Sequence, residues 1–392
     1  MATIPSFQHA TPAYRTFCGP KALAALPREL DRLGARRAVI VGGPWLVALP
    51  DVLGAIESAV GPRLAGRFDD VQEHSPVPSV EAARALLEDV DADAVIAVGG
   101  GSSIVTARAA TILLAEKKDA RELCTQRGDD GKLVSPRLSA PKIPNWVIPS
   151  TPITAYAKAG SAVSDPATGE RLALYDPKTR AQGIFLDPEV ALSAPVGLAS
   201  TASLNAFSMA VECIEAGVDD PLADALLLHA LRLLTEWMPR LRSAPDDPEP
   251  RLRLMLAALL CGQGSDFVGG GLAQALSHAA GPRSSVANGM VEALLLPSTM
   301  SFNSVVTKDR LTLIAELLDP GAAKGATAAD RAVASVREVL SKAGVPQRLR
   351  DVGLTQDALV EVTEHALDDW SITRVPRPVD RDGLLHLLQT AW

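Results

Sequence analysis

Three glycines and two serines stand together at Gly99 to Ser103, directly after an apolar run. Glycines let the backbone turn sharply and approach a ligand closely, because no Cβ is in the way. A helix that begins here directs its unpaired N–H groups at the turn, where an anion is favoured. We interpret Gly99, Gly100, Gly101, Ser102 and Ser103 as a cradle for a pyrophosphate. The alternative is a tight strand-to-helix turn without a ligand, because the sequence is not a G-x-G-x-x-G fingerprint.

The neighbouring residues predict the elements that position this turn. Val95 to Val98 is apolar and rich in β-branched residues, which predicts a strand buried on both faces. Ile104 to Glu116 predicts the helix that follows. Two further apolar runs, Arg37 to Val41 and Trp146 to Pro149, also predict strands.

Small or hydroxyl residues follow each of these strands: Gly42 and Gly43 in one case, Ser150 and Thr151 in another. Strands that alternate with helices imply a mostly parallel sheet, and its ligands bind beyond the carboxyl ends of the strands. We therefore expect these four residues to share one crevice with the glycine-rich turn.

The second half of the chain has a different pattern. Strand signals nearly vanish after Pro195, and helical patterns recur from Ala199 to Thr390. We predict an α/β domain over residues 1–194, with a Rossmann-like parallel sheet, and an all-helical domain over residues 195–392.

Composition excludes several classes of function. The 392 residues carry a net charge of −8 and show no basic run, so we expect no nucleic-acid partner. No uninterrupted apolar stretch is long enough for a membrane span, and the N-terminus shows no signal pattern. Four scattered cysteines form neither a metal motif nor a disulfide framework, so we expect buried, reduced thiols and a cytoplasmic protein.

The order of these motifs resembles the iron-containing (group III) alcohol dehydrogenase family, and within it the maleylacetate reductase branch. The resemblance runs nearly end to end. It rests on the glycine-rich turn and on five further matches, at Pro149–Thr151, Asp187–Pro188, Thr201–Glu212, Gly271–Pro297 and Arg377–Pro378. It implies a dehydroquinate synthase-like fold, a nicotinamide cofactor at the nine glycine, serine and threonine positions above, and a homodimer.

The same resemblance shows a departure at the metal site. Family members usually hold one divalent metal with an Asp and three His, and the matching positions here are Asn205, Met209, Gln274 and Asn288. The resemblance implies that Asn is normal at the first position in the reductase branch, whereas the other three residues are departures. Iron or zinc sites need imidazole, thiolate or carboxylate donors. We therefore expect no catalytic metal. Three amides are not left in an apolar core without hydrogen-bond partners, so we expect them to line a polar pocket and bind the substrate.

A second departure lies in the loop that the resemblance places beside the substrate. Pro152, Ile153 and Tyr156 add bulk there, and Lys158 adds a positive charge. Lys158 is a candidate for holding a substrate carboxylate, as are Arg283, Arg374 and Arg377, although the pattern favours a solvated surface charge for each of them.

Hydride transfer without a metal needs hydrogen-bond donors and a proton donor. His278 is the first candidate for the proton donor, because it is the family-matching histidine that remains and its ordinary pKa allows proton transfer in both directions. Tyr156 is the second candidate. A carboxylate after the first strand would reject a 2′-phosphate, and Gly42-Gly43-Pro44 offers none, so both NADH and NADPH are permitted.

The leading hypothesis is a metal-independent, NAD(P)H-dependent reductase similar to maleylacetate reductase. It would reduce a C=O or a conjugated C=C bond of a small substrate, with or without a carboxylate. The first alternative is a non-redox enzyme that carries out a dehydration or cyclisation by acid–base catalysis. We expect the pocket to lack Glu and Asp, which argues against that alternative. The second alternative is a binding protein without catalysis.

Overall fold

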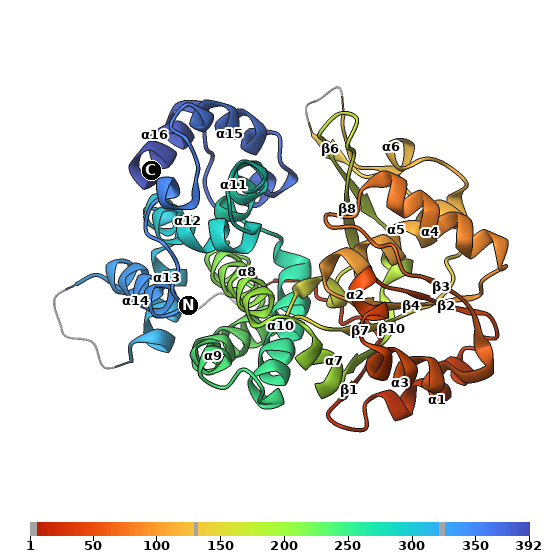
Figure 1. Cartoon of the computed structure of the whole chain (residues 1–392). Helices are drawn as coiled ribbons and strands as arrows, with labels where there is room; N and C mark the ends of the chain where they lie inside the picture. Colours follow the sequence, from red (N-terminus) through yellow and green to blue (C-terminus); the bar gives the residue numbers. More distant parts are fainter. Residues whose placement is uncertain (1–5, 129–131, 321–325) are drawn as a thin grey trace. The chain divides into compact units, whose positions relative to one another are not determined.

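The computed structural model of the chain describes residues 6–128, 132–320 and 326–392. These residues divide into two compact units (Figure 1). The α/β unit comprises Pro12–Pro195 and Asp246–Leu252, and the helical unit comprises Val196–Pro245, Arg253–Trp392 and the described part of Met1–Thr11. Compared with the expected ranges, the N-terminal segment groups with the helices, and Asp246–Leu252 groups with the α/β unit.

Six strands form one sheet in the α/β unit, and all their pairings are parallel, as the sequence predicts. The strand order is β1-β10-β7-β4-β2-β3. Their bounds are β1 Arg15–Cys18, β2 Ala38–Val41, β3 Leu64–Phe68, β4 Ala94–Gly99, β7 Asn145–Pro149 and β10 Ala181–Leu186.

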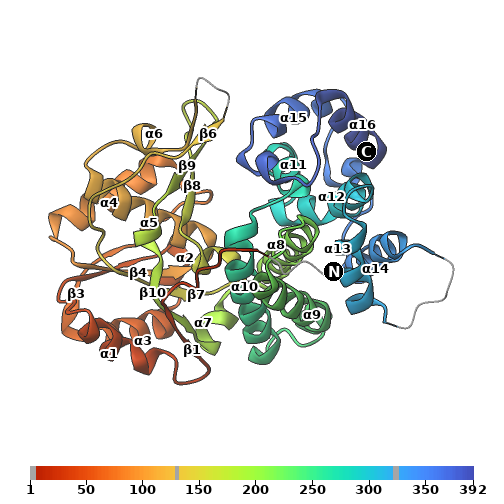
Figure 2. The same ribbon diagram turned by 180° about the vertical axis from the view of Figure 1, so that it is seen from behind.

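Helices cover both faces of this sheet (Figures 1 and 2). Helices α1 (Leu26–Arg32) and α3 (Pro50–Val60) lie on one face, and α4 (Val77–Asp89) and α5 (Gly101–Glu116) lie on the other. Successive side chains of a strand point to opposite faces. With a helix layer on each face, strands β2, β4 and β7 are buried over their whole length, which explains their unbroken apolar sequences.

The strand order reverses between β2 and β4. From β2 the chain continues outward to β3, whereas β4 lies on the other side of β2 and is followed by β7 and β10. The carboxyl ends of β2 and β4 are the positions of Gly42-Gly43 and of the glycine-rich turn. In open α/β sheets, ligands bind outside the carboxyl ends of the strands at such a reversal.

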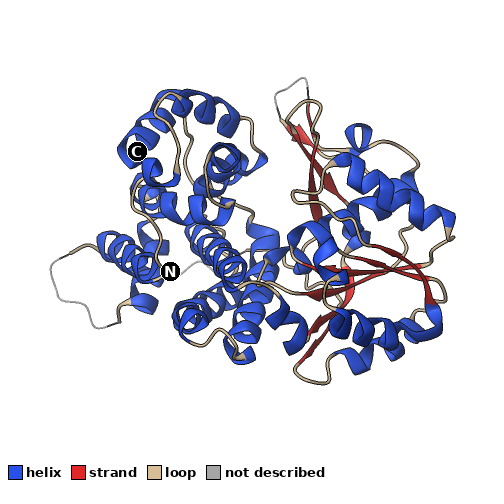
Figure 3. Ribbon diagram, in the orientation of Figure 1, coloured by secondary structure: helices blue, strands red, loops and turns tan. Residues whose placement is uncertain are grey.

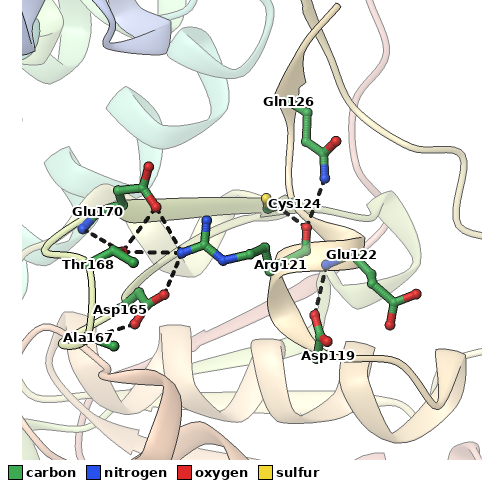
Figure 4. Close-up of polar contacts among 9 residues, drawn as sticks. All are labelled: Asp119, Arg121, Glu122, Cys124, Gln126, Asp165, Ala167, Thr168 and Glu170. Atoms are coloured by element: carbon green, nitrogen blue, oxygen red, sulfur yellow. Dashed lines mark hydrogen bonds and ion pairs between the residues drawn. The ribbon is translucent and has the colours of Figure 1, made fainter.

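A two-stranded hairpin of β8 (Gly160–Ser164) and β9 (Arg171–Tyr175) projects from this unit. Figure 4 shows how Arg121 of α6 (Ala120–Leu123) holds its turn. One Arg121 nitrogen lies 2.5 Å from Asp165 Oδ2 and 2.8 Å from Glu170 Oε2, so the two ends of the turn are bridged through one guanidinium group. The sequence prediction did not include this hairpin.

The helical unit shows helices and loops, and no β-strand, over its described residues (Figure 3). The prediction of an all-helical second half is therefore confirmed for the part of the chain that the structure describes. Its α-helices are α8 Val196–Glu215, α9 Pro221–Ser243, α10 Pro248–Val268, α11 Leu272–Ala280, α12 Asn288–Asn303, α13 Lys308–Leu318, α14 Ala328–Lys342, α15 Ala358–Leu367 and α16 Arg381–Ala391, where the first turn of α10 belongs to the α/β unit. Among the described residues, no helix has the length and apolar character needed to cross a membrane.

The structure corrects an expectation about the cysteines. Cys124, Cys213 and Cys261 are buried, but Cys18 is exposed, because it ends the edge strand β1. Burial raises the pKa of the Cys124 thiol, so that residue is an unreactive thiol as expected.

Candidate functional site

The glycine-rich turn begins with Gly99, where the backbone conformation and the neighbouring atoms require glycine. Gly99 has φ +131°, and a Cβ there would lie 2.7 Å from Ser103 Oγ and 3.1 Å from Trp45 Cζ2. Gly42 and Gly43 are closely packed but have no positive φ, and added Cβ atoms would lie 2.9 Å from Leu46 Cδ2 and 3.0 Å from Trp45 Cδ1 respectively. Internal structure therefore explains Gly99 without a ligand.

Trp45, in the short helix α2 (Pro44–Val47), is the common neighbour of Gly43 and Gly99. It is half-buried and lies where the carboxyl ends of β2 and β4 meet. The sequence interpretation did not include Trp45. The signal that could have found it is its position, two residues after a glycine pair at the end of a buried strand.

The next two glycines have a different environment. A Cβ on Gly100 would lie 3.3 Å from Thr151 Oγ1, and a Cβ on Gly101 would meet only Ile153 Cδ1, at an ordinary contact distance of 3.8 Å. Packing within the protein does not demand glycine at Gly101, so the space beside it is available to a bound group. The 16-residue helix α5 starts at Gly101, with its first N–H groups at this space.

Hydrogen bonds hold the neighbouring segments around the turn. Ser150 N donates to Gly99 O at 3.0 Å, and Ser102 Oγ accepts from His74 N at 3.1 Å. The nine predicted cofactor residues thus come from the carboxyl ends of β2, β4 and β7 within one unit. Open backbone beside a helix N-terminus suits the phosphate groups of a cofactor.

Tyr156 and Lys158 lie in the α/β unit, in and directly after the 3₁₀ helix η3 (Thr154–Ala157). Tyr156 has no exposed surface, whereas Lys158 is half-buried. The buried Arg108 of α5 holds this segment by donating to Ala155 O at 2.7 Å and Gly160 O at 2.6 Å. The catalytic role of Tyr156 and the substrate-binding role of Lys158 stay predictions.

His278 lies in the last turn of α11, in the helical unit. Its Nδ1 is 2.7 Å from Asp369 Oδ2, and the side chains are 14% and 12% exposed respectively. Burial acts to raise the pKa of Asp369. The positive charge of His278 and the hydrogen bonds from His278 and Ser371 outweigh burial, so the pKa of Asp369 lies below its ordinary value.

Gln274 lies one helical turn before His278, and hydrogen bonds hold both its side chain and its backbone N–H. Its Oε1 accepts a hydrogen bond from Ser371 Oγ at 3.0 Å, and its backbone N–H donates to Glu212 Oε2 at 3.2 Å. Glu212 Oε1 also accepts from Ala273 N at 2.5 Å. Glu212 of α8 therefore caps the N-terminus of α11, where a carboxylate is favoured.

Asn205 of α8 donates through Nδ2 to Oε2 of Glu292 on α12. Burial raises the pKa of Glu212 well above its ordinary value, and the nearby carboxyl of Glu292 raises it further. Both carboxyl groups are buried, and a like charge nearby disfavours the ionised form. Burial and the neighbouring carboxyl therefore both favour the protonated form of Glu212.

The remaining predicted residues lie in the same unit. Met209 is buried on α8, and Asn288 is half-buried at the start of α12. A Cβ on Gly281 would lie 1.8 Å from Asn288 Oδ1, and a Cβ on Gly289 would lie 3.0 Å from Asn205 Cβ. These glycines let the amide side chains lie directly against backbone.

The arginine candidates have partners within the protein. Arg283 donates to Ala279 O at 2.7 Å and pairs with Glu361 Oε1 at 2.5 Å. Arg377 donates to Phe302 O at 3.0 Å, and Arg374 packs its aliphatic stem against Gly269. These contacts give all three arginines a part in packing or pairing within the protein, and their role in substrate binding stays a prediction.

The four positions that match the family's metal ligands do not fit a divalent iron or zinc site. The amide nitrogen of Asn205 donates to Glu292, and the amide oxygen of Gln274 accepts from Ser371. Met209 has only a thioether sulfur. Amides and a thioether bring neither charge nor basicity to such a site. In residues 6–128, 132–320 and 326–392, no group of three or more His, Cys, Asp and Glu side chains is arranged to hold a metal ion.

Comparison with protein families decides the assignment. The model of "Iron-containing alcohol dehydrogenase" matches residues 13–188, and the model of the "Fe-containing alcohol dehydrogenase family, C-terminal" matches residues 199–392. The chain belongs to the iron-containing alcohol dehydrogenase family. It is accordingly an oxidoreductase that uses a nicotinamide cofactor, and the predicted family and fold are confirmed.

Curated relatives include maleylacetate reductase 1 of Cupriavidus pinatubonensis, 27% identical over 96% of this chain and 95% of the relative. The maleylacetate reductase of Rhizobium sp. strain MTP-10005 is 27% identical over 98% of this chain and 97% of the relative. The crystal structure of maleylacetate reductase from that Rhizobium strain has a TM-score of 0.79 at 26% identity and covers 99% of each chain. An alcohol dehydrogenase from Oenococcus oeni, at 21% identity and a TM-score of 0.89, covers 99% of this chain and 100% of its own and shows the shared fold.

The structure contradicts the expectation that the predicted pocket residues lack neighbouring carboxyl groups. Glu292 contacts Asn205, Glu212 contacts the backbone of Gln274, and Asp369 contacts His278. Each carboxyl lies on a different segment from its partner and far from it in sequence. The partnerships therefore appear only when α8, α11, α12 and the segment that contains Asp369 are packed together.

Proposed function

We propose that this chain is an NAD(P)H-dependent reductase that works without a bound metal ion. Its substrate would be a small molecule with a C=O or a conjugated C=C bond, and carboxylated substrates are the first class to test. The observation that carries the proposal is the hydrogen bonding of Gln274 and His278. Gln274, at a position that matches a metal ligand of the family, has its amide oxygen held by Ser371, and His278, one helical turn later, has its Nδ1 held by Asp369.

The cofactor part of the proposal rests on the α/β unit. Gly100, Gly101 and the first turn of α5 would hold the phosphate groups, with Ser150 and Thr151 on the neighbouring strand end. A bound reduced nicotinamide supplies a hydride. No carboxylate stands at Gly42-Gly43 to reject a 2′-phosphate, so the proposal includes both NADH and NADPH.

The helical unit would supply the other two requirements of a reduction. The hydrogen bond from Ser371 to Gln274 Oε1 leaves the amide nitrogen of Gln274 to donate to a substrate oxygen. Asp369 holds His278 Nδ1, so His278 Nε2 is the nitrogen that exchanges a proton with the substrate. Together these groups would stabilise and then neutralise the negative charge that develops on the substrate, as an oxyanion hole with an acid does.

The relatives suggest where the substrate search should start. Two of them are maleylacetate reductases by name. The altered loop sequence at Pro152–Tyr156 and the changed metal-ligand positions support a substrate other than maleylacetate for this chain.

The test is NADH or NADPH consumption by chelator-treated protein with a panel of small 2-oxo, 4-oxo and unsaturated oxo acids and their uncharged analogues. We expect consumption with at least one member, lost in the His278→Gln variant. Consumption that begins only after iron or zinc is added would overturn the metal-independent mechanism.

A second candidate function is non-redox acid–base catalysis on the same fold. The His278–Asp369 pair favours it, because an imidazole held by a carboxylate can act as a general acid or base. Turnover of a hydroxy acid by dehydration, in the absence of any nicotinamide, would support this candidate over the reductase.

A further inference from the structure

We propose that Asp369 and Ser371 are positioning residues, which together fix the His278 imidazole and the Gln274 side-chain amide on one face of α11. The catalytic consequence rests on the proposed function, whereas the positioning itself can be measured without cofactor or substrate.

Three hydrogen bonds and the backbone of α11 join His278, Asp369, Ser371 and Gln274 into a closed ring. Gln274 and His278 are four residues apart on α11, so they lie on the same face of the helix. Asp369 Oδ2 lies 2.7 Å from His278 Nδ1, and Asp369 Oδ1 accepts from Ser371 N at 2.8 Å. Ser371 Oγ then donates to Gln274 Oε1 at 3.0 Å, which returns the ring to α11.

The segment that provides both partners is the 3₁₀ helix η7 (Trp370–Arg374), whose N-cap is Asp369. Ser371 has no exposed surface, and Asp369 is largely buried. Two side chains of one short turn thus reach two side chains on one helix face. Because the capping bond joins Asp369 to Ser371, a shift of one partner would move the other.

The ring determines which atoms of His278 are donors. A carboxylate only accepts hydrogen bonds, and the lowered pKa of Asp369 keeps it ionised. His278 Nδ1 must therefore carry a proton, and Nε2 is left as the nitrogen that gains and loses one. A carboxylate partner of this kind fixes the tautomer and orientation of an imidazole.

The ring also determines the orientation of the Gln274 amide. A Cβ on Gly270 would lie 1.7 Å from Gln274 Oε1, so the amide oxygen occupies space that only glycine leaves open at position 270. The Ser371 hydroxyl holds that oxygen, and the amide nitrogen is consequently the end that can donate elsewhere.

The first test is nuclear magnetic resonance of protein labelled with ¹⁵N-histidine, without cofactor or substrate. The His278 signals are assigned by their loss in His278→Gln. Above the pH at which the imidazole loses its charge, we expect His278 to be protonated on Nδ1. An Nε2-protonated tautomer in the wild-type protein would overturn the proposal, whatever the variants do.

The second test uses two variants that act on different partners. Asp369→Asn keeps a capping residue for η7, but its amide no longer enforces a proton on Nδ1. We expect it to shift His278 toward the Nε2-protonated tautomer and to lower kcat by about tenfold to a hundredfold, with little change in the KM for the cofactor. Ser371→Ala is the matched control: it should leave the His278 tautomer unchanged and raise the KM for the substrate.

The outcomes separate this proposal from the proposed function. The expected tautomers in a protein that never consumes NADH or NADPH would support the positioning and overturn the reductase. Reductase activity with an unchanged His278 tautomer in Asp369→Asn would overturn the positioning and leave the reductase intact.

Discussion

Asn205 on α8 donates a side-chain hydrogen bond to Glu292 on α12, at the position where the family resemblance places an Asp or Asn. The carboxyl of Glu292 also acts electrostatically on Glu212 of α8. An amide between two helices, held by a buried carboxyl, is therefore part of the packing of α8 against α12. This arrangement favours a neutral donor at position 205 over a further negative charge.

Replacing Asn205 by Asp tests that relationship. Asn205→Asp would place a third carboxyl beside Glu212 and Glu292, and we expect it to lower the free energy of unfolding at neutral pH by about 1–4 kcal/mol. Urea denaturation measures the change. In a Glu292→Gln background the same substitution should lower the free energy of unfolding much less, because a neutral amide then lies beside the new carboxylate. Equal costs in both backgrounds would show that Asn205 and Glu292 do not interact.

Two glycines of the cofactor turn should respond oppositely to alanine. Gly101→Ala adds a Cβ that meets only Ile153 Cδ1, at 3.8 Å, so we expect little change in stability and weaker cofactor binding, by about tenfold. Gly99→Ala must place a side chain at φ +131° and 2.7 Å from Ser103 Oγ, and we expect it to destabilise the fold by about 1–3 kcal/mol. Melting curves and cofactor titrations of both variants distinguish the effects. Unchanged cofactor affinity in Gly101→Ala would indicate that the turn is structural only.

Glu215 predicts a dependence of stability on pH. Burial raises its pKa to about 7, against hydrogen bonds from Asn303 and Thr307 that act to lower it. The folded protein therefore binds this proton more tightly than the unfolded chain, whose pKa is near 4.5. This contribution to the free energy of unfolding is fully present below pH 4.5 and is lost as the pH rises through about 7. The difference between the two pKa values corresponds to about 3 kcal/mol.

The Glu215→Gln variant is the measurement for this dependence. The glutamine side chain carries no charge at any pH. Its amide oxygen can accept from Asn303 Nδ2, and its amide nitrogen can donate to Thr307 Oγ1, whose hydroxyl also lies within reach of Asn303 O. The stability of the variant should therefore vary less than that of the wild type between pH 5 and pH 8. Denaturation curves at both pH values show the difference. Parallel pH profiles of the two proteins would contradict the assignment of the titration to Glu215.

Most of the fold could be predicted from the sequence, because its signals are local. Strands β2, β4 and β7 are fully buried and therefore read as unbroken apolar runs, and the helices of the second half show their own periodicity. Strand β1 is an exposed edge strand, and β8 and β9 alternate buried and exposed residues in a short hairpin. Neither pattern resembles a buried strand, so these strands were not predicted.

Local detail was less predictable than element type. The sequence Pro76-Val77-Pro78-Ser79 predicts a helix that starts after Ser79 and is capped by it, but α4 begins earlier, at Val77, with Pro76 as its N-cap. Ser79 Oγ instead donates to Asp70 O at 3.0 Å, so the hydroxyl holds the preceding loop. The expectation of a Ser79 cap is wrong because the proline-bearing segment already starts the helix.

The candidate site was only partly predictable, because its partners are distant in sequence. Glu292 and Asp369 contact Asn205 and His278 across 87 and 91 positions respectively. A glutamate on a helix usually indicates a solvated face. The available signal was context: Glu212 and Glu292 each interrupt an otherwise apolar helical run, which is typical of a buried carboxyl with a specific partner.

The central claim is that the chain binds a nicotinamide cofactor and needs no metal. The most direct measurement is a titration of chelator-treated protein with NADPH and NADH, followed by nicotinamide fluorescence and paired with elemental analysis of the same sample. We predict micromolar binding of at least one cofactor by protein that contains far less than one iron or zinc per chain. Failure to bind either cofactor at millimolar concentration, or binding that requires a retained metal ion, would contradict the claim.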